Sequence, residues 1–261
     1  MTVAVILGSA FREPVIAGRQ LEPLTLLTRF GGAVLHRYPR EDREAWVMFR
    51  HGTPHSFLPN QIPFQAQAVA LGDIGCQSLL VTSSVGGMDP DLPLDVPLLL
   101  SDILMPDNSL PDGSACTVFP EPTVGQGHLV LDEGVFSREL STQVERLAAR
   151  AGHPVAGRAV FAYTKGPRTK TAAENAMWAE LGGQVNSMTV APEVVLANEL
   201  GIPVAGLVVG HKYSVPGVHD RLDHAGISHA LRAAWKTLDD LARVFLEEAQ
   251  PVPFANRLFR L

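Results

Sequence analysis

Residues 166–214 read GPRTKTAAENAMWAELGGQVNSMTVAPEVVLANELGIPVAGLVVGHKYS. The stretch joins a Gly-Pro-Arg turn, a helix-like run over 171–181, the tripeptide Ser187-Met188-Thr189 and an apolar run over 204–209 that ends in polar residues. Polar residues that gather where apolar strands end mark the ligand-binding edge of an α/β sheet. We therefore predict that the functional site of the chain lies here.

Apolar runs that alternate with amphipathic stretches continue this pattern along the chain. Short apolar runs predict buried strands at 3–7, 45–49, 78–82, 98–104, 160–163 and 204–209. Helical spacing and cap residues predict helices at 64–71, 137–151, 171–181, 193–200 and 227–248, with Pro192 in the first position of the fourth. Residues 107–127, rich in Pro, Gly, Ser and Asp, predict a long surface loop. Apolar strands alternating with helices indicate a mainly parallel sheet covered on both faces.

The composition is that of a globular enzyme and excludes several kinds of partner. The chain has 261 residues, a net charge of −6, 18% charged residues and no basic block, so neither nucleic acid nor an anionic membrane is expected. The N-terminal apolar run is too short for a signal peptide, and we expect a cytoplasmic protein. Cys76 and Cys116 indicate two buried free thiols. Since no repeat or linker is found, we expect one domain over residues 1–261.

Several strand ends carry residues that suit anion binding, and each has a simpler interpretation beside it. Gly8-Ser9 could hold an oxyanion or form a plain strand-to-helix turn. Arg50-His51 fits an anion clamp or a surface ion pair. The hydroxyls of Ser83 and Ser84 suit an anion but lack the G-x-S-x-G pattern of serine hydrolases. The G-x-G-x-x-G pattern is missing too, so no dinucleotide site is expected.

A metal site is not expected. His51 and His55 have the i, i+4 spacing of a metal pair, but Gly52 and Pro54 between them disfavour a helix. Met188 on its own is as compatible with core packing as with a ligand contact.

Taken together, these motifs occur in a specific order over nearly the whole chain. They are Gly8-Ser9, Arg50-His51-Gly52, His55, Pro59, Phe64-Gln65-Ala66, Thr82-Ser83-Ser84, Gly86-Gly87, Gly166-Pro167-Arg168, Thr171, Ala173-Glu174, Met188, Pro192-Glu193 and Gly201. In this order and spacing the chain resembles the trimeric nucleoside phosphorylases, the family of purine nucleoside phosphorylase and methylthioadenosine phosphorylase.

The resemblance implies a single-domain three-layer α/β/α fold with a mixed central sheet, assembled as a homotrimer. It implies a pentosyltransferase of purine salvage that cleaves a purine or purine-like nucleoside, 5′-methylthio nucleosides included. Inorganic phosphate is the co-substrate, and neither a cofactor nor a metal is required. Two functional alternatives remain: a non-catalytic nucleoside-binding protein of the same fold, and a nucleoside hydrolase.

The resemblance also assigns residues by position. Phosphate would be bound by Ser9, Arg50, His51, Ser83, Ser84 and Thr189. The sugar would be contacted by Met188, His128, Ser228 and His229, with His128 reaching a neighbouring subunit. The base would be contacted by Lys170, Ser187, Lys212 and Ser214. Direct catalytic roles would fall to Lys212, His51 and Ser84.

The chain departs from the family mainly in the base pocket. Thr169 and Lys170 replace a Phe-Glu or Phe-Ser pair, and Lys212 replaces an Asn or Asp. An ammonium only donates hydrogen bonds, so recognition of adenine in the family manner is not expected. One hypothesis is that Lys212 donates to N7 or O6 of an oxopurine as a general acid. A second is that both lysines select an anionic or carboxylated base, and a third is that both turn to solvent or pair with carboxylates.

The remaining departures are smaller. Ser187 replaces a Gly or Asn, Ser214 replaces an Asp, Ala10 replaces a Gly, and Leu94-Asp95-Val96 replaces Pro-Gly-Asp.

Overall fold

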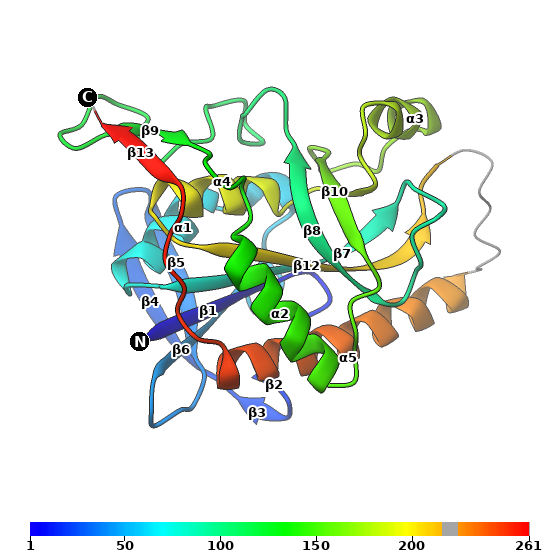
Figure 1. Cartoon of the computed structure of the whole chain (residues 1–261), viewed down its shortest axis with the longest axis horizontal. Coiled ribbons are helices and arrows are strands. Elements are labelled where there is room, and N and C mark those ends of the chain that lie inside the picture. The colour runs from blue at the N-terminus through cyan, green and yellow to red at the C-terminus, as the bar shows by residue number, and fades with distance from the viewer. Residues whose placement is uncertain (216–223, 261) are drawn as a thin grey trace.

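The computed structural model describes residues 1–215 and 224–260, without the side chains of 224–231. Its main feature is a nine-stranded sheet (Figure 1). In spatial order the strands are β11 (Val185–Ser187), β10 (Arg158–Tyr163), β8 (Pro97–Leu104), β12 (Val204–Tyr213), β7 (Ser78–Gly87), β1 (Thr2–Leu7), β6 (Glu44–Phe49), β5 (Gly31–Arg37) and β4 (Glu22–Thr28). Two smaller sheets pair β2 (Val15–Ile16) with β3 (Arg19–Gln20) and β9 (Gly127–Val130) with β13 (Arg257–Arg260).

The sheet is mixed, as expected. Strands β6, β1, β7 and β12 run parallel, and β8, β10 and β11 are parallel to one another, whereas β8 joins β12 antiparallel. At its far end β7 also pairs antiparallel with β11, through Gly86 and Gly87. The strands β7, β12, β8, β10 and β11 therefore form a closed ring, and β11 lies beside the carboxyl ends of β7 and β12.

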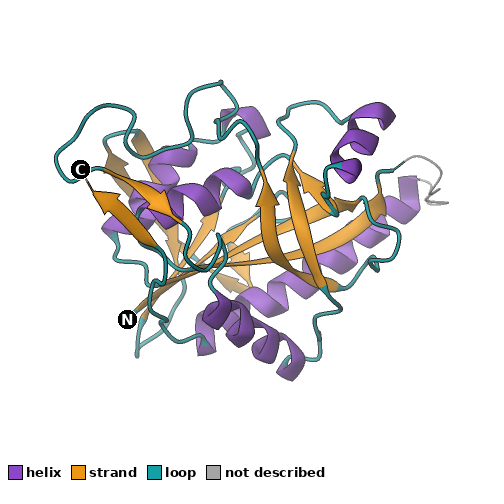
Figure 2. Cartoon of the chain, turned by 45° about the horizontal axis from the view of Figure 1, so that its top comes forward, coloured by secondary structure: helices purple, strands orange, loops and turns teal. Residues whose placement is uncertain are grey.

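Helices cover both faces of the sheet, which confirms the three-layer architecture (Figure 2). The helices are α1 (Phe64–Asp73), α2 (Arg138–Arg150), α3 (Ala172–Glu180), α4 (Ala191–Glu199) and α5 (His224–Glu248), and a short 3₁₀ helix spans Pro59–Gln61. One apolar cluster contains Leu140 of α2 and Leu238 of α5, and a second contains Ala70 of α1 and Val194 of α4. Each helix pair thus buries one face of the sheet. In the described residues no helix is long and apolar enough to cross a membrane.

The helix ends follow the residue types in the sequence. Ser137 accepts a hydrogen bond from the amide of Leu140 (3.3 Å), and Thr171 forms a capping box with Glu174. The glycines beyond α2, α3 and α4 all have positive φ, as in C-terminal caps of this kind. Helix α4 begins at Ala191 rather than at Pro192, so the proline occupies its second position and not its first as predicted.

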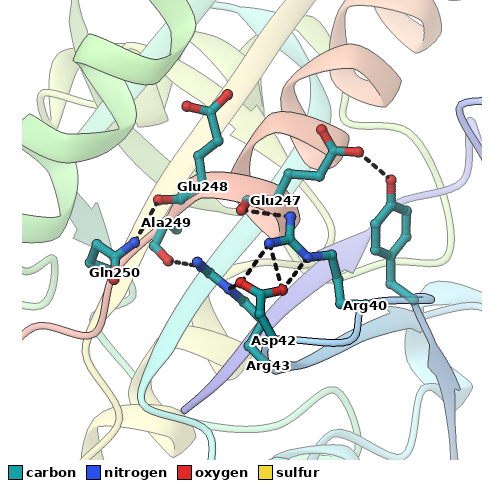
Figure 3. Close-up of polar contacts among 8 residues, drawn as sticks. Arg40, Asp42, Arg43, Glu247, Glu248, Ala249 and Gln250 are labelled. Atoms are coloured by element: carbon teal, nitrogen blue, oxygen red, sulfur yellow. Dashed lines mark hydrogen bonds and ion pairs between the residues drawn. The ribbon is translucent and has the colours of Figure 1, made fainter.

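Two arginines fix the C-terminal end of α5 to the segment between β5 and β6 (Figure 3). Arg40 donates to the carbonyl oxygen of Glu247 (2.8 Å) and Arg43 to that of Ala249 (2.5 Å). Asp42 pairs with both arginines. Cationic donors at this position satisfy carbonyls that the helix leaves without a partner and oppose the negative end of its dipole.

The hairpin β4–β5 and the short strand β11 are not predicted from the sequence. In the hairpin the outward side chains of Leu27 (88% exposed) and Val34 (43% exposed) are apolar, so the alternation of a half-buried strand is hidden. The strands at 78–82 and 204–209 are longer than predicted and run on to Gly87 and Tyr213. The other predicted strands and helices are confirmed, and Cys76 and Cys116 are buried free thiols.

Gly206 in the central strand β12 offers a test of this packing. A Cβ there would lie 2.7 Å from Cε1 of Phe136 and 2.8 Å from Cδ1 of Leu100. We expect Gly206→Ala to lower the free energy of unfolding by about 1–3 kcal/mol, because two packed side chains must shift. Gly32→Ala is the matched control, since its nearest contact is 4.0 Å away. Equal urea midpoints for the two variants would contradict the packing described.

Candidate active site

A cavity of about 540 Å³ opens at the carboxyl ends of β7 and β12, beside β11. All six residues assigned to phosphate line it, namely Ser9, Arg50, His51, Ser83, Ser84 and Thr189. Met188 and the four residues assigned to the base, Lys170, Ser187, Lys212 and Ser214, line it as well. The structure therefore brings eleven of the predicted residues, from segments far apart in the chain, to one place.

Arg50 is the most constrained cation of the cavity. The residue is 1% exposed, and its guanidinium donates to both carboxylate oxygens of Glu193 (2.6 and 2.7 Å) and to the carbonyl oxygen of Thr82 (2.8 Å). Gly8 permits this position, because a Cβ on it would lie 2.9 Å from Nη1 of Arg50. Three of the five guanidinium N–H groups are thus engaged, and two remain for a ligand.

Glu193 holds Arg50 from the first turn of α4. Burial raises the pKa of the Glu193 carboxyl, and the paired guanidinium opposes that shift. Since a guanidinium stays protonated, loss of the carboxylate charge would leave a buried cation without a partner. We therefore treat the pair as ionised. Sequence patterns place Glu193 in a family motif and at the start of a predicted helix, so this contact, whose partners are 143 positions apart, was not predicted.

His51 is held as a neutral hydrogen-bond acceptor. Its Nδ1 lies 2.8 Å from the carbonyl oxygen of Phe57, which can only accept, so we assign the proton to Nδ1 and a lone pair to Nε2. Burial, together with the neighbouring Arg50 cation, lowers the pKa of His51 to about 4. His55 stacks on the imidazole with ring centroids 4.4 Å apart. The described residues contain no group of three or more potential metal ligands.

Thr189 follows β11 and precedes a strained turn. Val190 has φ 71° and ψ −62°, and the amide of Ala191 donates to the carbonyl oxygen of Thr189 (2.9 Å). These values define a γ-turn of the rare, positive-φ kind. Such strain is retained where the surrounding structure fixes it, and it is frequent at ligand sites. Here the turn places the buried Thr189 in the cavity wall directly before α4.

Four further polar residues line the cavity and were not predicted from the sequence, namely Thr164, Asn175, Asn186 and His211. Asn175 and Asn186 are 8% and 9% exposed, and Nδ2 of Asn186 donates to Oδ1 of Asn175 (3.0 Å). His211 also lines the cavity, and burial, followed by the Lys212 cation, lowers its pKa to about 4. No local signal marks the asparagine pair, because α3 and β11 must fold together to create it.

Three predicted residues are not brought to this cavity. His128 lines a different cavity of about 580 Å³ and stacks on Phe259, with ring centroids 5.2 Å apart. Ser228 and His229 belong to α5, but their side chains lie outside the described part of the chain.

Comparison with known proteins gives a consistent picture. A sequence model of the Phosphorylase superfamily matches residues 2–247. The 6-oxopurine nucleoside phosphorylase of Pyrococcus furiosus is 27% identical over 259 residues, covering 98% of this chain and 94% of that protein. A probable S-methyl-5′-thioinosine phosphorylase of Methanopyrus kandleri is 30% identical over 223 residues, covering 85% of this chain and 82% of that protein. The methylthioadenosine phosphorylase of Schistosoma mansoni, solved with adenine, has the same fold, with a TM-score of 0.81 at 22% identity over 95% and 92% of the two chains.

The neutral state of His51 predicts a pH dependence of stability. Its pKa is about 4 in the folded chain against 6.5 when unperturbed, so the unfolded state binds the proton more readily. The neutral His51 therefore contributes fully to the free energy of unfolding above pH 6.5, and this contribution is lost as the pH falls towards 4. Between pH 7 and 4 we expect the protonation of His51 to lower the free energy of unfolding by about 1–3 kcal/mol. Urea titrations between pH 7 and 4 should show a smaller decrease for His51→Gln, and an identical decrease would contradict the assignment.

Proposed function

Because the chain belongs to the Phosphorylase superfamily, we propose that it transfers the pentosyl group of a purine nucleoside to inorganic phosphate. The products are the free purine and a pentose 1-phosphate. The observation that carries the proposal is the joint location of Ser9, Arg50, His51, Ser83, Ser84 and Thr189 in one cavity with Met188. The motifs that resembled the trimeric nucleoside phosphorylases thus belong to a chain of this superfamily.

The phosphate would lie against Arg50. The two free N–H groups of its guanidinium and the hydroxyls of Ser84 and Thr189 would donate to phosphate oxygens, and Nε2 of His51 would accept from a protonated one. Glu193 fixes the guanidinium before phosphate arrives, so little reorganisation is needed when charge develops.

The reaction would be a displacement at C1′. A phosphate oxygen forms the new C1′–O bond while the C1′–N9 bond breaks and its electron pair leaves with the base. The sugar carries positive charge between the two, and the negative phosphate stabilises it. For this reason the paired carboxylates of a glycosidase are not required.

Met188 would lie under the pentose. A Cβ on Gly166 would come within 2.8 Å of its sulfur, so the glycine of the Gly-Pro-Arg turn leaves room for the thioether. Arg168 of the same turn pairs with both carboxylate oxygens of Glu174, which ties the turn to α3. The turn therefore positions the sugar site and does not supply the phosphate site.

For the base, we propose a 6-oxopurine. Relatives named for 6-oxopurine and methylthioinosine substrates are among those most similar to this chain. Lys212, which lines the cavity, can donate to O6 or N7 but cannot accept from the amine of adenine.

A homotrimer is part of the proposal. His128 lies outside the cavity of its own chain, near the half-exposed side chains of Leu131 and Phe259. His128 would contact a nucleoside only across an interface with a second copy of the chain. We also propose that the protein is cytoplasmic.

The first test measures base release from inosine with and without phosphate. We expect release only with phosphate, together with ribose 1-phosphate. Ser84→Ala should lower kcat/KM for phosphate about 10- to 100-fold, because one hydrogen bond to a charged oxygen is lost.

Ser101→Ala replaces an exposed serine on β8 and is the matched control, which should leave kcat/KM for phosphate unchanged. Release without phosphate would indicate a hydrolase, and binding without release a non-catalytic protein.

The second test concerns assembly. Sedimentation equilibrium should give three times the chain mass of 28.1 kDa. His128→Ala should keep this mass and raise KM for the nucleoside several-fold. A monomer with full activity would disprove the shared site.

A further inference from the structure

We infer that the base end of this cavity selects a nucleoside whose base is anionic, of the 2,6-dioxopurine type, in preference to neutral purines. The inference rests on the proposed phosphorolysis and narrows its substrate. Lysine is rare in this chain, with four lysines among 21 Lys and Arg residues. Two of the four, Lys170 and Lys212, line the cavity. The structure excludes the hypothesis that both simply turn to solvent.

Lys170 is fixed where its loop enters α3. Its Nζ donates to the carbonyl oxygens of Lys165 and of Arg168, the latter at 3.3 Å. Two of the three N–H groups are therefore held by the backbone, and one is left for a ligand. Burial, and then the nearby Arg168 cation, lowers the pKa of Lys170, so its charge is only partly solvated. A negative ligand group would replace that missing solvation.

Lys212 approaches the same end of the cavity from the opposite side of Gly86. In the sheet Gly86 is the register partner of Lys212 on β12 and of Asn186 on β11. Because neighbouring strands lie about 4.8 Å apart, Lys212 and Asn186 flank a floor roughly one base wide. A Cβ on Gly86 would lie 2.3 Å from Oγ of Ser214 and 2.9 Å from Oδ1 of Asn186. The glycine thus allows both polar atoms to converge over this floor.

The asparagine pair sets the direction of the remaining hydrogen bonds. Both N–H groups of Asn186 are used, by Oδ1 of Asn175 (3.0 Å) and by the sulfur of Met88 (3.2 Å). Oδ1 of Asn186 is consequently an acceptor, which suits a ring N–H. Nδ2 of Asn175, which also lines the cavity, is a donor, which suits an oxo group. A dioxopurine presents oxo groups and a ring N–H along one edge.

Charge decides between an anionic and a neutral base. The described residues that line the cavity include Arg50, Lys170 and Lys212 but neither aspartate nor glutamate. A neutral base would leave the ammonium groups of Lys170 and Lys212 without a negative partner in the cavity, and a guanine amine would find no carboxylate. An anionic base compensates both charges, because hydrogen bonds between charged partners are about twice as strong as neutral ones.

The test compares xanthosine, a monoanion at neutral pH, with inosine and guanosine, which share its 6-oxo group and are neutral. At saturating phosphate we expect kcat/KM for xanthosine to exceed both others at least about tenfold. Lys212→Met and Lys170→Met should each lower kcat/KM for xanthosine about 10- to 100-fold, and the loss for inosine should be at least about threefold smaller. Lys236→Met replaces an exposed lysine on α5 and should leave kcat/KM for both xanthosine and inosine unchanged.

Turnover of inosine in preference to xanthosine, or equal losses for both substrates in the lysine variants, would overturn the inference while phosphorolysis stands. If no nucleoside is cleaved, phosphorolysis fails, and calorimetry with the free bases and phosphate decides the inference separately. Tighter binding of xanthine than of hypoxanthine, lost in Lys212→Met, would support it. Equal binding of the two bases would overturn it.

Discussion

The contact on which the rest of the site depends is the buried ion pair of Arg50 and Glu193. It joins the end of β6 to the first turn of α4 through two hydrogen bonds of 2.6 and 2.7 Å. Removing one partner of such a pair typically costs about 3–5 kcal/mol, because the other charge stays buried. The same pair leaves two N–H groups of the guanidinium, which lines the cavity, for the proposed phosphate. Stability and the proposed anion binding would therefore be coupled through one side chain, for which Gly8 leaves space.

Much of the fold follows from short-range patterns. Apolar runs, cap residues such as Ser137 and Thr171, and glycines beyond the helix ends predict six of the nine strands of the main sheet and all five helices. The mixed sheet follows from the family resemblance and not from the apolar runs alone. The hairpin of β4 and β5 and the ring closure by β11 could not be predicted, since exposed apolar residues hide the first and pairing between distant segments creates the second.

For the site, position within the family motifs identified eleven residues that the structure gathers in one cavity. The sequence could not show that Lys170 is held by backbone carbonyls or that Asn186 is oriented by Asn175. These relations depend on side chains that meet only after α3, β11 and β12 have assembled. The residues proposed to bind phosphate can thus be selected from motifs, whereas a proposal for the base end requires the three-dimensional arrangement.

Ring closure also determines how the chain meets other chains. Since β11 pairs with both β10 and β7, β4 is the one edge strand of the main sheet within the described residues. An unpaired edge is a template for aggregation through strand addition. Pro23 in this strand has no N–H to offer, which interrupts the row of donors that an incoming strand would pair with. The ring that shapes the cavity thereby leaves one edge strand at which amyloid-like strand addition could begin, and that strand contains a proline.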